Sequence, residues 1–67
     1  MNKELGNRIK TIRENASLTQ DEVAKHLGIS KEEFAGIELG VFSPTLAILN
    51  QLAKLFDVSV KTLTENI

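Results

Sequence analysis

The sequence predicts an all-α fold, a compact five-helix bundle in a single domain. Two segments have the S/T-x-x-E spacing of a capping box, in which a hydroxyl and a glutamate bind the first free backbone N–H groups of a helix. Apolar residues recur at intervals of three and four, which indicates helices with one buried face. No segment shows the alternation that is typical of a strand.

The first helix is expected over residues 3–15, because Leu5, Ile9 and Ile12 recur there at helical spacing. Residues 15–18 interrupt this pattern and form a loop. None of the expected helices is long enough to be stable alone in water. Packing between the helices must therefore stabilise the fold.

The second and third helices are expected over residues 19–27 and 30–39, each starting at a capping box. Gly28 and Gly40 follow them and suit the left-handed conformation found past a helix C-terminus. The boxes pair Thr19 with Glu22 and Ser30 with Glu33, and the buried faces comprise Val23, Ala24 and Leu27, then Phe34 and Ile37. Two short helices joined by a three-residue turn form a helix-turn-helix, whose second helix can enter a DNA major groove.

The fourth helix is expected over residues 45–56, after a loop in which Pro44 disfavours helix at the preceding residue. Its inward face should comprise Leu46, Leu49, Leu52, Ala53 and Phe56. A fifth helix is expected over residues 60–65. Ser59 caps this helix, which should bury Leu63 and Ile67.

The composition excludes several classes of function but does not identify one. With 67 residues, the chain has room for one core. It has no cysteine and one histidine, so we expect no disulfide, no metal site, no cofactor and no catalytic pair, and hence no enzyme. It lacks an apolar run of membrane-spanning length and a signal-peptide core, which predicts a cytoplasmic protein that does not bind membranes. The net charge of −1 gives no field that favours nucleic acid, so DNA binding depends on the motif.

A family resemblance extends from Leu5 to Leu63. The segments that carry it are Arg8-Ile9-Lys10, Ile12-Arg13, Leu18-Thr19-Gln20, Glu22-Val23-Ala24, Leu27-Gly28-Ile29-Ser30, Ile37-Glu38, Gly40, Pro44-Thr45-Leu46, Leu52-Ala53-Lys54 and Asp57-Val58-Ser59. In this order and spacing they resemble the lambda-repressor/Cro-type helix-turn-helix proteins, the XRE family. The resemblance implies a lambda repressor-like fold that binds double-stranded DNA.

The resemblance also implies roles for single residues. In such proteins the second helix crosses the phosphate backbone and the third reads base edges. The matching base-reading positions are Ser30, Lys31, Glu32, Ala35 and Gly36. The matching phosphate contacts are Gln20, Gly40, Val41, Ser43 and Thr45, partly through backbone N–H groups. Arg13 and Glu38 are expected to form a structural ion pair between the first and third helices.

Several of these residues suit DNA poorly. Lys31 can donate to guanine, Glu32 can accept from cytosine, and Ala35 can contact a thymine methyl group, but Gly36 reads nothing. Between residues 19 and 45, two lysines stand against five acids, a balance of −3. Three of those acids have expected structural roles in the caps and the ion pair, so the repulsion from phosphates is milder than this balance suggests.

Five apolar residues form a second anomaly, since their positions lie away from the expected core faces: Leu39, Val41, Phe42, Ile48 and Leu55. Two interpretations stay open. They can form a patch that binds a protein partner, chiefly through Leu39, Val41 and Phe42. Alternatively, Phe42 folds back onto the core and the others are ordinary exposed residues.

The motif and the resemblance together predict a sequence-specific transcription regulator, a repressor that reads the major groove with helix 30–39. The resemblance implies that it binds DNA as a two-fold dimer. Short members of the family are typically repressors, phage or plasmid regulators, or antitoxins. Half-sites are expected about 10–10.5 base pairs apart or at a multiple of that spacing. The dimer surface is expected near Leu55 and Ile67. The alternative is a helix-turn-helix fold that serves as a protein-protein interaction module with weak or no DNA binding.

Overall fold

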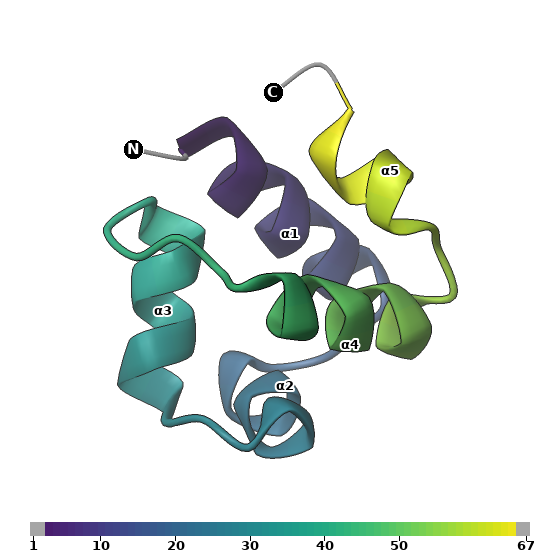
Figure 1. The fold of residues 1–67 in the computed structure, drawn as a ribbon. Helices are drawn as coiled ribbons and strands as arrows, with labels where there is room; N and C mark the ends of the chain where they lie inside the picture. Colours follow the sequence, from purple (N-terminus) through teal and green to yellow (C-terminus); the bar gives the residue numbers. More distant parts are fainter. Residues whose placement is uncertain (1–2, 66–67) are drawn as a thin grey trace.

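A computed structural model describes residues 3–65, and within that range all regular structure is helical. The helices are α1 (Lys3–Asn15), α2 (Gln20–Leu27), α3 (Lys31–Leu39), α4 (Leu46–Phe56) and α5 (Val60–Thr64). Figure 1 shows α1 between α3 and α5, and α2 and α4 meet across the other end of the bundle. The prediction of an all-α, five-helix fold is confirmed over the described residues.

Caps set the helix boundaries as predicted. Thr19 and Ser30 precede α2 and α3 in extended conformation, and both capping boxes are complete. Gly28 and Gly40 end the same helices with φ of +72° and +80°, the left-handed region that a residue without Cβ adopts at least cost. Local signals therefore determine where these two helices begin and end.

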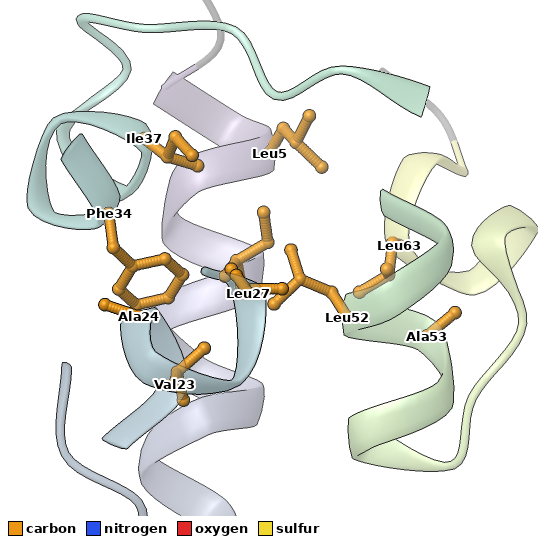
Figure 2. Packing of buried hydrophobic residues seen from close by; sticks show 10 residues of the cluster. Leu5, Val23, Ala24, Leu27, Phe34, Ile37, Leu52, Ala53 and Leu63 are labelled. Carbon is orange, nitrogen blue, oxygen red and sulfur yellow. The ribbon is translucent and has the colours of Figure 1, made fainter. Parts of the chain in front are cut away.

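One mainly aliphatic core joins all five helices, and the ring of Phe34, fully buried, lies at one side of it next to Ala24 (Figure 2). The core comprises Leu5, Ile9, Val23, Ala24, Leu27, Phe34, Ile37, Leu52, Ala53 and Leu63. Every face predicted for α2 and α3 is buried as expected. Ile67, predicted to be buried by the last helix, lies outside the described residues.

Helices α1 and α3 approach each other most closely at Gly6. A Cβ at this position would overlap the backbone carbonyl groups of Ile37 and Glu38. Backbone atoms cannot move aside as a flexible side chain can, so only glycine fits at this contact. The sequence analysis did not identify Gly6, because no local pattern shows which helix faces it.

The predicted inward face of α4 is wrong at Leu46, which is 68% exposed. The inward side of α4 is centred on the buried Leu52. Leu46 lies about 120° around the helix from that residue. Ile48 and Leu55 lie within about 60° of Leu52, and both are half-buried against the core instead of exposed. The buried face is therefore rotated relative to the prediction.

The C-terminal helix is tied to α1 by Arg8. Its Nη1 atom donates to the backbone carbonyl oxygens of Thr62 and Glu65 at 3.2 and 2.6 Å. A guanidinium is well suited to the unsatisfied carbonyl groups at the end of a helix. This contact places α5 against the first helix, so α1 contacts partners on two sides.

Candidate nucleic-acid interface

The outward stripe of α3 is the surface that the helix-turn-helix presents. It consists of Lys31, Glu32, Ala35 and Leu39, which lie between about 60° and about 160° around the helix from the buried Phe34. Lys31, Glu32 and Leu39 are exposed, and Ala35 is half-buried. Lys31, Glu32 and Ala35 thus lie where the prediction of base-reading residues placed them.

Gly36 was predicted to face outward, and the structure corrects this. Gly36 is buried, because the ring of Phe42 lies over it. A Cβ at position 36 would overlap the ring carbons Cδ2 and Cε2 of Phe42. The absence of a side chain therefore has a packing role, which is to admit this ring.

The position of Phe42 matches neither of the two interpretations completely, a protein-binding patch or a side chain folded back onto the core. Its side chain contacts α3, yet 52% of the residue stays exposed. It also borders a pocket of about 250 Å³ between α3 and α4, whose lining comprises Ile29, Glu33, Ile37, Phe42, Ser43, Thr45 and Ile48. Leu39 and Val41 are 67% and 64% exposed, so an apolar surface continues from the ring.

The predicted ion pair between α1 and α3 is present and buried. Arg13 Nε donates to Glu38 Oε2 at 2.6 Å, and Arg13 Nη2 donates to Glu38 Oε1 at 3.3 Å. The hydrogen bond with Glu38 raises the pKa of Arg13 above its ordinary value, so the guanidinium stays charged. Its Nη1 atom donates to the carbonyl oxygen of Leu18 at 2.8 Å, which secures the loop before α2.

Gln20 joins the same ion pair. Its Nε2 atom donates to Glu38 Oε1 at 2.8 Å, so the amide points toward α3. We predicted this residue as a phosphate contact, and that role stays a prediction. No local pattern indicates the link to Glu38, since the two residues are 18 positions apart.

The loop between α3 and α4 holds the other predicted phosphate contacts. The backbone N–H groups of Gly40 and Val41 donate to carbonyl oxygens of Ile37 and Gly36 at 3.1 and 2.9 Å. These donors close the end of α3, so the expectation that they meet phosphates is not supported. Ser43 and Thr45 are exposed, and Thr45 Oγ1 accepts from the backbone N–H group of Ile48 at 3.1 Å.

The acids near this surface are mostly engaged. Glu22 and Glu33 complete the two capping boxes, and Glu38 is in the buried ion pair. Asp21 lies 3.6 Å from Lys25, measured from carboxylate oxygen to Nζ. Glu32 is the acid on the outward stripe, so the balance of −3 overstates the repulsion that DNA phosphates would meet.

Over residues 3–65, no group of three or more histidine, aspartate or glutamate side chains could hold a metal ion. Within the same residues, no helix has the length and apolar character to cross a membrane.

Comparison with known sequences identifies the family. A family model described as a helix-turn-helix domain matches residues 6–66. An HTH-type transcriptional regulator of Methanocaldococcus jannaschii is 36% identical over 55 residues, which cover 82% of this chain and 83% of that protein. The cryptic phage CTXphi transcriptional repressor RstR of Vibrio cholerae is 32% identical over 59 residues, or 88% of this chain and 53% of the repressor.

Solved structures of similar proteins have the same fold. The N-terminal DNA binding domain of SinR from Bacillus subtilis superposes with a TM-score of 0.83 at 30% identity, covering 92% of this chain and 91% of that domain. The restriction-modification controller protein C.AhdI from Aeromonas hydrophila has a TM-score of 0.84 at 24% identity, with 91% and 92% covered, which shows the shared fold. These relatives are regulators and not enzymes. The chain belongs to the XRE-type helix-turn-helix family of DNA-binding transcription regulators.

Proposed function

We propose that this protein is a repressor that binds a specific duplex sequence in the cytoplasm as a two-fold dimer, with the outward stripe of α3 in the major groove. The outward stripe carries this proposal. Three of its four residues are exposed, while the helix itself is held by the buried Phe34 and by the Arg13–Glu38 ion pair. A rigidly held helix with one open face is suited to read base edges.

Each stripe residue contributes a different chemistry. Lys31 begins α3 and can donate to the O6 and N7 acceptors of guanine. Glu32 can accept from the amino group of cytosine, and Ala35 can contact a thymine methyl group. Ser43 and Thr45 are exposed in the segment before α4 and are proposed to contact phosphates.

Repression and dimerisation are supported by different observations. A relative that matches 88% of this chain is a phage transcriptional repressor, which favours repression. A two-fold protein dimer matches a pseudo-palindromic operator, whose half-sites lie about one helical turn apart or a multiple of it. The C-terminal part of α4 and α5 offer the dimer surface, since Leu55 stays partly exposed beside the exposed Gln51 and Lys54.

The test is an in vitro selection of random duplex DNA by the purified chain, at low and then near-physiological salt. We expect a two-fold motif and two chains per duplex in sedimentation equilibrium. Failure to enrich any motif at low salt would contradict DNA recognition and favour the protein-interaction module instead. A motif bound by one chain per duplex would contradict the dimer alone.

Lys31→Ala tests which helix reads the sequence. We expect the variant to lose about 1–3 kcal/mol of binding free energy for a half-site that contains the guanine. It should also discriminate less between bases at that position. Lys10→Ala is the matched control, because it removes the same charge from an exposed position on α1. Binding titrations with the selected duplex and single-base variants measure both effects. Equal losses for the two variants would contradict base reading by Lys31.

A further inference from the structure

The second half of the outward stripe is apolar and exposed. Leu39 follows Ala35 by four residues and Glu32 by seven, so it lies on the same side of α3 as both. It is 67% exposed, although the other side of the same helix is in the core. The surface that we place in the major groove therefore ends in a large aliphatic side chain.

The Phe42 ring extends this apolar surface. It occupies the space into which a side chain at position 36 would project, beside the outward stripe. The loop that carries the ring is fixed, because the backbone N–H groups of Val41 and Phe42 both donate to the carbonyl oxygen of Gly36, at 2.9 and 3.2 Å. The ring is thus held on α3 in place of a residue-36 side chain, with 52% of Phe42 exposed.

The apolar side chains of this surface are suited to contact one feature of DNA. Ala35, Leu39 and Phe42 carry no side-chain donor or acceptor, so they cannot read the polar pattern of the base edges. The apolar group on the major-groove edge of the bases is the C5 methyl group of thymine. Burying a methyl group against apolar carbon gains affinity through the hydrophobic effect.

We propose that Leu39 and Phe42 read thymine methyl groups in the major groove, so that each half-site pairs a guanine with nearby thymines. This inference rests on the proposed function, in which α3 enters that groove. Leu39 follows Lys31 by eight residues, or about 12 Å along the helix axis. Since base pairs are about 3.4 Å apart, the thymines lie within about four base pairs of the guanine.

The apolar patch is continuous with the outward stripe, which favours DNA over a protein as its occupant. A cluster of exposed apolar residues often marks a protein-binding surface. Here, however, Leu39 lies on the base-reading side itself, and Phe42 covers Gly36 in the middle of the same helix. A protein bound to these two residues would exclude α3 from the groove.

The experiment replaces each thymine of the selected duplex, one at a time, by deoxyuridine, which lacks only the methyl group. We expect one or two replacements in each half-site to weaken binding about fourfold, the equivalent of one lost methyl contact. Leu39→Ala should abolish the thymine preference at one position, and Phe42→Ala at a neighbouring position. Phe42→Leu keeps an apolar side chain and should retain most of the preference.

Leu46→Ala is the matched control, since Leu46 is 68% exposed but lies on α4. It should keep the full thymine preference, and circular dichroism checks that every variant folds. A selected half-site without thymine, or a preference that survives both Leu39→Ala and Phe42→Ala, would overturn the proposal and favour a protein partner for this patch. Failure to select any motif is a different result, because it would refute the proposed function itself.

Discussion

The inner and outer sides of α3 differ in burial and in the contacts that their side chains make. On the inner side, Phe34 is fully buried, Ile37 packs beside it, and Glu38 is in the ion pair. On the outer side, Lys31 and Leu39 are exposed to solvent. The inner side fixes the orientation of the helix, so the outer residues can be changed without loss of the fold. One helix of nine residues thus carries both the packing contacts and the surface proposed to recognise DNA.

Glu38 is the centre of the inner side. Its carboxylate accepts hydrogen bonds from Arg13 on α1 and Gln20 on α2, and Arg13 also reaches the carbonyl oxygen of Leu18. One acid therefore connects α3 to both preceding helices and to the loop between them.

Glu38→Ala should lower the free energy of unfolding by about 3–5 kcal/mol, because it leaves the Arg13 guanidinium buried without its partner. A loss of this size is comparable to the whole stability of a small domain. Urea unfolding monitored by circular dichroism measures it. The matched control is Leu39→Ala, the next residue on the outer side, for which we expect a change within about 0.5 kcal/mol.

Equal losses for these two variants would contradict the division of α3 into two sides. Replacing both charged residues, as in Arg13→Met with Glu38→Leu, should cost far less than Glu38→Ala, since no buried charge is left unpaired. A double variant as unstable as Glu38→Ala would show that the hydrogen bonds to Leu18 and Gln20 carry the effect instead.

Gly6→Ala should destabilise the protein by about 1–3 kcal/mol, because the added Cβ forces α1 away from the backbone of α3. Thermal unfolding measures the loss, with Asn7→Ala at the exposed neighbouring position as control. An unchanged midpoint for Gly6→Ala would mean that the two helices do not approach as closely as the structure shows.

The capping boxes provide a smaller contrast between α2 and α3. Thr19→Ala and Ser30→Ala should each cost about 1 kcal/mol of unfolding free energy. The loss should be greater at Ser30, whose hydroxyl accepts from the N–H group of Glu33 at 3.0 Å and also donates to Glu33 Oε1 at 3.3 Å, whereas the Thr19 hydroxyl accepts from the N–H group of Glu22 at 3.1 Å. Chemical denaturation of both variants gives the order, and a greater loss at Thr19 would contradict it.

The smallest expected effect is a change in stability at low pH. The backbone hydrogen bond from Thr19 lowers the pKa of the Glu22 carboxyl below its ordinary value of 4.5. A lowered pKa in the folded state adds stability above the ordinary value, and this contribution disappears as the pH falls through the lowered pKa. Glu22→Gln should therefore be less stable than the unaltered protein near neutral pH and approach it in acid. Melting curves from about pH 7 to about pH 3 test this, and a difference independent of pH would contradict it.

Prediction from sequence succeeded for features that form within a few residues. The capping boxes, the left-handed Gly28 and Gly40, and the apolar periodicity placed α2 and α3 correctly. The Arg13–Glu38 pair was expected from the family resemblance and is present. By contrast, the outward placement of Gly36 and the inward placement of Leu46 were wrong, since each depends on what packs against the helix.

Local sequence signals were enough to set the helices, their caps and the order of the helix-turn-helix, because they act through hydrogen bonds between residues a few positions apart. Only the packing of the helices places Gly6 against α3, joins Gln20 to the ion pair and lays Phe42 over Gly36. Such contacts join different helices and loops, and the crossing of the helices sets which side chains meet. The residues around the Phe42 ring, on which the proposed reading of thymine depends, are therefore ones that a linear pattern could not place.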